Sequence, residues 1–408
     1  MKTHRLTYQL TLLAFFIALI VIAMGAFTRL SHAGLGCPDW PTCYGHILWP
    51  DAEHEIYIAN QRFDETPVDT NKTWPEQVHR LLASSLGLFS LLIFFSALRR
   101  SKDKALKTKV IFFLSVFLLA LVSRIFLAAQ WKITAAVMYD FFDISIAIIS
   151  VTILVALMML GIKKSHYDVK TMLVLPALIV AFVILQGLFG MWTVTLKVWP
   201  QVVTIHLLGG FTVLSLLWLA VLRLRQNMWQ IPYRYASKIP SLKTYAAVVL
   251  LIVVTQIALG GWTTSNYAAV ACPELPTCQN QWWPQMDFKK AFDIGQAIGP
   301  NYLGGQMDNS ARMAIHMSHR IGAVITTLAV IFLALLLLQL RQKAVTRMAY
   351  VALGILALQI ALGLSNILFH FPISIAVLHN AVGALLLLSM VTVNYQIRTS
   401  IIQESDDE

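Results

Sequence analysis

Ten long, continuously apolar runs divide this chain of 408 residues. A helix that crosses a bilayer needs about 20 predominantly apolar residues. The runs do not alternate between apolar and polar positions, which favours helices over the strands of a membrane barrel. They lie at residues 8–28, 78–98, 110–129, 141–162, 171–193, 202–222, 244–264, 314–340, 346–369 and 374–394. The pattern predicts an all-α polytopic membrane protein. The first run leads into Thr28-Arg29-Leu30 rather than a small-residue cleavage site, so we expect it to remain as a helix.

Composition agrees with this class and adds an orientation. Hydrophobic residues make up 58% of the chain and charged residues only 12%. With ten spans and the N-terminus inside, one side carries 20 Lys and Arg against 6 Asp and Glu, and the other side carries 11 against 14. The positive-inside rule then predicts that both termini are cytoplasmic. The net charge of +11 is a topology signal and not evidence for a nucleic-acid partner. No Arg- and Ser-rich transit segment comes first, which favours a bacterial plasma membrane.

The chain also repeats itself. The stretch "GAFTRLSHAGLGCPDWPTC" from Gly25 aligns with "GGWTTSNYAAVACPELPTC" from Gly260 at an offset of 235 residues. Further on, "QGLFG" from Gln186 aligns with "QIALG" from Gln359 at an offset of 173 residues. The offset falls because the first half contains an additional segment at residues 104–168. The repeat predicts two tandem four-helix bundles in parallel orientation, with an inserted helix pair in the first half.

These boundaries define the expected units. They are an N-terminal bundle at 1–103 and 169–225, an inserted transmembrane hairpin at 104–168, a cytoplasmic linker at 226–243, a C-terminal bundle at 244–397 and an acidic cytoplasmic tail at 398–408. Arg124, Asp140 and Asp143 of the insert would lie near the outer ends of adjacent helices, where an ion pair would permit insertion. We expect a structural hairpin; a docking surface for a partner is the alternative.

All four cysteines fall in the outer loops that follow the first helix of each repeat. They form two pairs with the same spacing, Cys37 with Cys43 and Cys272 with Cys278. The outer side is oxidising in bacteria, so we predict two local disulfides. Metal binding is the rival interpretation, but zinc sites prefer closer cysteines and more ligands.

Four histidines recur across the repeat: His79, His206, His319 and His379. Each lies in the first turns of a span that enters from the outer side, so each bundle offers two histidines at similar depth. A neutral imidazole is a common axial ligand of haem iron, and two facing helices of a bundle can hold an iron between them. The alternative is four ordinary buried histidines, but polar groups in a membrane are costly without a role.

Several charged residues stand near these histidines. Glu76 lies one helical turn before His79, where the second half has His316 instead. A carboxylate there could move protons or stabilise a developing cation; the alternative is an acid that stabilises the start of a helix after Pro75. Arginines at this depth could bind haem propionates or extend to the membrane interface. These candidates are Arg29, Arg80 and Arg320.

Six stretches together resemble the haem A synthase family. They are "GAFTRLSHAGLGCPDWPTC", "EQVHR", "LQGLFGMWTV" with "VVTIHLLGG", "MSHRIGA" and "IAVLHNAVGA". We expect the resemblance to cover nearly the whole chain except residues 104–168. The family is a polytopic membrane oxidoreductase that converts haem O to haem A by oxidising a ring methyl to a formyl group. Its product serves haem-copper cytochrome oxidases.

The resemblance implies a role for each candidate. His319 and His379 would be the axial ligands of a resident haem b, the cofactor. His79 and His206 would line the haem O site, with Glu76 as the catalytic carboxylate. The family usually has eight helices, whereas this chain has ten apolar runs.

Two other classes of protein fit part of the pattern. A dihaem membrane cytochrome b would explain the histidine pairs but not the single Glu76. A transporter built on parallel repeats would move its substrate unchanged, and its broken helices would meet at the membrane midplane. The expected partners are haem O and the lipid bilayer; a haem O synthase, an electron-transfer protein and a second copy of the chain are further candidates.

Overall fold

The computed structural model describes residues 5–130, 171–298 and 300–403, and these residues are predominantly helical. Eight helices in this part of the chain are long and apolar enough to cross a membrane. The prediction of an all-α polytopic membrane protein is confirmed. A helix satisfies its backbone N–H and C=O groups internally. This is necessary because the bilayer core contains no water to form hydrogen bonds with them.

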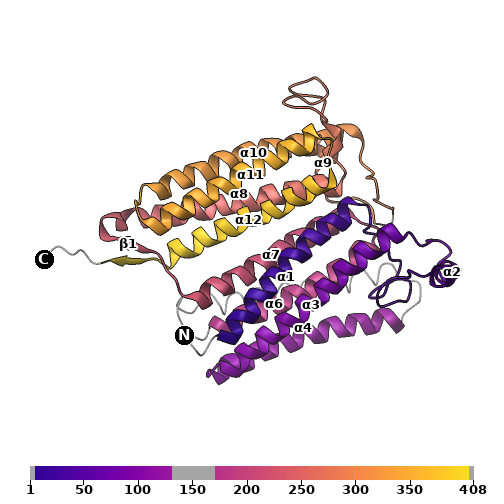
Figure 1. Cartoon of the computed structure of the whole chain (residues 1–408), viewed down its shortest axis with the longest axis horizontal. Coiled ribbons are helices and arrows are strands. Elements are labelled where there is room, and N and C mark those ends of the chain that lie inside the picture. The colour runs from indigo at the N-terminus through magenta and orange to yellow at the C-terminus, as the bar shows by residue number, and fades with distance from the viewer. Residues whose placement is uncertain (1–4, 131–170, 299, 404–408) are drawn as a thin grey trace.

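The eight helices form two four-helix bundles that lie side by side (Figure 1). In the first bundle, α1 packs on α3, α3 on α6, α6 on α7 and α7 on α1. In the second, α8, α10, α11 and α12 close a ring in the same order. The helices are α1 (Arg5–Leu30), α3 (Thr70–Arg100), α6 (Thr171–Thr195), α7 (Pro200–Arg225), α8 (Ile239–Ser265), α10 (Asn309–Leu338), α11 (Lys343–Leu368) and α12 (Ile373–Arg398). Each ring places α3 diagonally opposite α7, and α10 diagonally opposite α12.

Helix starts follow the local sequence. The carboxylate of Asp69 accepts a hydrogen bond from Asn71 N at the start of α3, and Asp308 does the same for Ala311 N at the start of α10. Such caps satisfy backbone N–H groups that have no partner within the helix. Pro200 opens α7, where its missing N–H costs nothing.

Short elements lie at the ends of the bundles. They are α2 (Glu53–Arg62), the 3-10 helices η2 (Tyr233–Lys238) and η3 (Ala269–Ala271), α9 (Phe288–Ala291), and the strands β1 (Gln230–Pro232) and β2 (Ile401–Gln403). The two strands pair in parallel. They tie the segment between the bundles to the residues that follow α12.

The insert is described in part. The predicted run 110–129 lies within the helix α4 (Lys104–Gln130), which packs on α6 at the edge of the first bundle. The run 141–162, Asp140 and Asp143 lie outside the described residues, and so does the side chain of Arg124. The count of ten spans stays a prediction.

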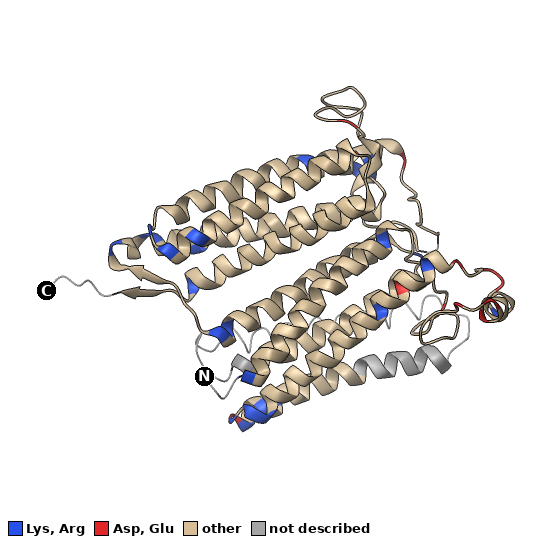
Figure 2. Ribbon diagram, in the orientation of Figure 1, with Lys and Arg blue, Asp and Glu red and all other residues tan. Residues whose placement is uncertain are grey.

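Charges differ between the two ends of the bundles. Figure 2 shows most Lys and Arg at the end where α1 begins and α12 ends, and most Asp and Glu at the opposite end, around α2. Both ends of the chain's helical part therefore lie on the basic side.

A polar network joins the two bundles near the cysteine loops. Arg29 at the end of α1 donates to Tyr267 Oη (2.6 Å), Thr264 O (3.1 Å) and Ser265 O (3.3 Å). Its guanidinium carbon lies 4.4 Å from the centre of the Tyr267 ring, within cation–π range. The ring of His32 also stacks on the Tyr267 ring, with 5.5 Å between the two ring centres. Arg29 thus acts as a brace between the bundles.

Replacing Arg29 by Ala removes these contacts. Hydrogen bonds to charged groups contribute about 1.5–3 kcal/mol each, and partial exposure lowers the sum, so we expect roughly 2 kcal/mol less free energy of unfolding. Denaturation of purified protein in detergent measures this loss. Arg5→Ala, at the exposed start of the same helix, should change little. Normal stability with reduced haem content in Arg29→Ala would instead favour the propionate prediction.

Candidate functional site

The four repeated histidines stand on diagonally opposite helices and occupy the interior of the bundles. His79 lies on α3 and His206 on α7, with ring centres 6.5 Å apart and planes at 88°. Metal–nitrogen bonds of about 2 Å would put two imidazoles on one iron at a similar separation of roughly 6 Å. In the second bundle, His319 lies on α10 and His379 on α12. The structure therefore brings the first histidine pair together at a distance that suits one metal atom.

Each histidine ring rests against a glycine of a neighbouring helix. A Cβ placed on Gly25 would lie 2.8 Å from His79 Cε1, and one on Gly260 would lie 3.1 Å from His319 Cε1. The same contact recurs for Gly190 with His206 (3.5 Å) and for Gly363 with His379 (3.1 Å). The helices without the paired histidines supply these glycines: α1, α6, α8 and α11. A side chain at the closest of these positions would push the ring out of the bundle interior.

Three of the four paired histidines have a ring nitrogen without a hydrogen-bond partner. Nδ1 is buried without a hydrogen-bond partner in His79, His206 and His379. In His319, Nδ1 meets the amide of Gln256 at 3.1 Å. No group of three or more His, Cys, Asp or Glu able to hold a metal ion occurs in the described residues. A haem fits such pairs, because the porphyrin supplies four nitrogen ligands and needs only axial ones from the protein.

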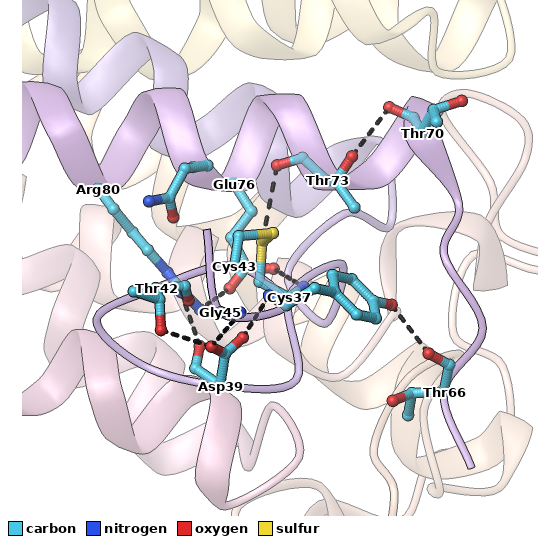
Figure 3. Close-up of a disulfide and its surroundings, with 12 residues drawn as sticks. Cys37, Asp39, Thr42, Cys43, Gly45, Thr66, Thr70, Thr73, Glu76 and Arg80 are labelled. Atoms are coloured by element: carbon cyan, nitrogen blue, oxygen red, sulfur yellow. Dashed lines mark hydrogen bonds and ion pairs between the residues drawn. A yellow bond between two sulfur atoms is a disulfide. The ribbon is translucent and has the colours of Figure 1, made fainter. Parts of the chain in front are cut away.

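Glu76 lies in the wall of the first bundle and is 4% exposed. Its Oε2 accepts a hydrogen bond from Cys37 N at 3.0 Å, and its Oε1 forms an ion pair with Arg80 (Figure 3). His316, at the corresponding place in the second bundle, is also 4% exposed, and its Nδ1 has no partner. An arginine side chain and a backbone N–H thus hold the Glu76 carboxylate in place.

The arginines beside the paired histidines contact the cysteine loops. Arg80 donates to Asp39 O (2.8 Å) and Thr42 O (2.7 Å). Arg320 donates to Thr277 O (2.9 Å), Cys272 O (2.9 Å) and Glu274 O (2.8 Å). Both arginines therefore hold the outer loop of their own bundle, and their propionate role stays a prediction.

Both loops contain a local disulfide. Cys37 and Cys43 have an S–S distance of 2.04 Å, and Cys272 and Cys278 one of 1.96 Å. All four cysteines are fully buried. Their sulfurs are bonded to one another, so the rival metal interpretation has no free thiol to use.

Asp39 organises the first loop from within. Burial favours its neutral form, but hydrogen bonds from Thr42, Gly45 and Tyr44 outweigh burial and hold the pKa of this carboxyl below its usual range. Figure 3 shows these contacts beside the disulfide. In the second loop, Glu274 Oε1 accepts from Asn280 N at 2.5 Å. An acid therefore folds each loop around its disulfide.

Comparison with known proteins identifies the family. The family model of COX15-CtaA, described as a cytochrome oxidase assembly protein, matches residues 8–123 and 144–391. This chain belongs to the COX15-CtaA family. The resemblance to haem A synthases drawn from the motifs is confirmed. The match also reaches into the insert and leaves out only 124–143. The expectation that the resemblance excludes residues 104–168 is wrong, since the match covers 104–123 and 144–168. The apolar sequence of the insert carries no motif that could be aligned by eye.

Curated relatives of this COX15-CtaA member carry the name "Heme A synthase". The one from Shewanella oneidensis is 38% identical over 395 residues, which cover 96% of each chain. The one from Rhizorhabdus wittichii is 29% identical over 50% of this chain and 56% of the relative. The one from Rickettsia felis is 23% identical over 48% of this chain and 54% of the relative.

The glycine contacts are a feature that sequence reasoning missed in this family member. Gly25 with Gly260, and Gly190 with Gly363, recur at the offsets of the repeat, 235 and 173 residues. The recurrence was visible in the sequence. The reason for the recurrence could not be read from the sequence, because only the packed structure shows which histidine ring each glycine faces.

Gly260→Ala should displace the His319 ring. The added methyl would stand 3.1 Å from Cε1, and overpacking of this kind costs about 1–3 kcal/mol. We expect loss of the low-spin haem absorption of the second bundle in the purified protein. Gly354→Ala on α11 is the matched control, since nothing lies within 4 Å of its added carbon. Unchanged spectra in both variants would argue against the glycine contact.

Proposed function

We propose that this protein is a haem A synthase, a membrane oxidoreductase that oxidises the ring methyl of haem O to a formyl group. The single observation that carries the proposal is the repeated histidine pair on diagonally opposite helices in a chain of the COX15-CtaA family. The near full-length relative named "Heme A synthase" supports it. The product, haem A, would serve a cytochrome oxidase.

In this proposal the two bundles divide the work. His319 and His379 would hold a resident haem b in the C-terminal unit, 244–397. His79 and His206 would hold haem O in the N-terminal unit, 1–103 with 169–225. The asymmetry between Glu76 and His316 supports this division, because the first bundle has an acid where the second has none. Bound haem supplies the redox-active iron for the oxidation.

The chain's own residues would bind, orient and shield the substrate. The histidines would hold the porphyrin from two helices, and the glycines leave room for the histidine rings. Glu76 lies one turn before His79, at the outer side of this site. Its ion pair with Arg80 and its hydrogen bond from Cys37 N hold the carboxylate in place there. In this role Glu76 would stabilise positive charge that develops on the substrate, or accept a proton at a carboxylate oxygen.

The cysteine loops would close the outer end of each bundle. The charge difference between the two ends supports a bacterial plasma-membrane protein with cytoplasmic termini and outer cysteine loops. We keep a haem O synthase, an electron-transfer protein and a second copy of the chain as proposed partners.

Expression with a source of haem O tests the reaction. We expect extracts to shift from haem O to the formyl product haem A, measured by chromatography and the pyridine haemochrome spectrum. A dihaem cytochrome b would leave haem O unchanged while showing two haem signals. A transporter would also leave haem O unchanged, and would move it across the membrane of reconstituted vesicles.

Glu76→Gln tests the role of the carboxylate. Loss of a group that acts on developing charge lowers turnover by about 100-fold or more. Haem A formed per folded enzyme measures the loss, with Glu65→Gln in an exposed part of the same outer segment as control. Because Glu76 also holds Cys37, disulfide content and thermal stability are measured in parallel. Normal turnover in Glu76→Gln would reject the catalytic assignment.

A further inference from the structure

Three of the four helices that supply the histidine-facing glycines share one sequence pattern, and the fourth departs from it. A glutamine stands four residues before the histidine-facing glycine in "QGLFG" (186–190), "QIALG" (256–260) and "QIALG" (359–363). In the fourth copy, "VIAMG" (21–25), a valine takes the place of the glutamine. Residues four apart lie on one face of a helix, so each of these residues meets the histidine-bearing helix one turn from the glycine.

In the second bundle, this glutamine holds the histidine at two points. Gln256 Nε2 donates to His319 O at 3.0 Å and lies 3.1 Å from His319 Nδ1. Gly322 on α10 makes the approach possible, since a Cβ there would overlap the Gln256 amide. These two contacts fix the orientation of the His319 ring.

The second histidine of this bundle has a similar but longer contact. Gln359 Nε2 lies 3.3 Å from His379 Nε2. Its other ring nitrogen, Nδ1, is buried without a partner. A glutamine therefore contacts one ring nitrogen of each histidine in the second bundle, Nδ1 of His319 and Nε2 of His379.

The first bundle lacks these contacts between a glutamine side chain and a histidine. Val21 has no polar side-chain atom to offer, and His79 Nδ1 is buried without a partner. Gln186 is present, but its amide packs over Gly209 on α7, and no hydrogen bond joins it to His206. His206 Nδ1 and Gln186 Oε1 are both buried without partners. Glutamine side chains thus form hydrogen-bond contacts with the histidine rings in the second bundle and not in the first.

We propose that Gln256 is a positioning residue that makes the second bundle retain its haem, and that Val21 at the equivalent place lets the first bundle release its haem. The inference rests on the proposed function, in which one haem is resident and the other is substrate and product. A residue that orients a metal-binding histidine typically contributes about 10- to 100-fold to affinity. A resident haem requires high affinity, whereas a haem that is substrate and product must be released. The repeat differs accordingly, with Gln256 in the second bundle and Val21 in the first.

The test exchanges the two residues in the full-length protein. Haem release from purified protein is followed optically with excess apomyoglobin as haem acceptor. Gln256→Val should speed release from the second bundle about 10- to 100-fold and shift the midpoint potential of that haem. Val21→Gln should slow release from the first bundle and leave the second unchanged.

Thr255→Val, a neighbouring lipid-facing position, is the matched control for folding. Wild-type release and potential in Gln256→Val would overturn the proposal. Equal loosening of both haems in Gln256→Val would also overturn it, because general destabilisation and not positioning would then be the cause. Release and potential need no turnover. A lack of haem A in extracts with the expected release rates would therefore reject the proposed function and leave this inference standing.

Discussion

The contact between an imidazole ring and a facing glycine is the constraint on which the rest of this structure depends. A four-helix bundle is close-packed, and a histidine that points to its axis needs space that an ordinary side chain would fill. Gly25 and Gly260 provide that space on α1 and α8, where an added Cβ would stand 2.8 and 3.1 Å from a ring carbon. Small residues also let membrane helices approach closely. The glycines that make room for the histidine rings therefore also allow the helices to pack closely.

The outer loops depend on the same helices. Arg80 follows His79 directly on α3, and Arg320 follows His319 on α10. One residue of each pair turns inward, and the other reaches the carbonyls of its cysteine loop. Loop and histidine are thus fixed by adjacent positions of one rigid helix. In the first bundle, Glu76 adds a bond to Cys37 N and joins the loop to the candidate carboxylate site.

Duplication explains how one architecture can serve two purposes. The two bundles share helix order, disulfide loops, histidines and glycines. They differ at a few positions close to the rings: Glu76 against His316, and Val21 against Gln256. Because the backbone framework is shared, these side chains account for the differences in polarity and hydrogen bonding at the two sites. The contact between Arg29 and Tyr267 joins the two bundles.

The sequence by itself determined the membrane class, the eight spans that the structure describes, the cysteine pairs and the four histidines, because apolar length, charge asymmetry and a long repeat are properties of the chain alone. It left open the partners of Arg29, Arg80 and Arg320, for which binding of propionates and positions at the interface fitted equally well. Only the tertiary structure decided that these guanidinium groups meet Tyr267 and the loop carbonyls. It also decided which glycine faces which ring and which glutamine reaches a histidine. Such contacts join residues of different helices, and their geometry depends on how the helices pack around the bundle axis, which no local pattern encodes.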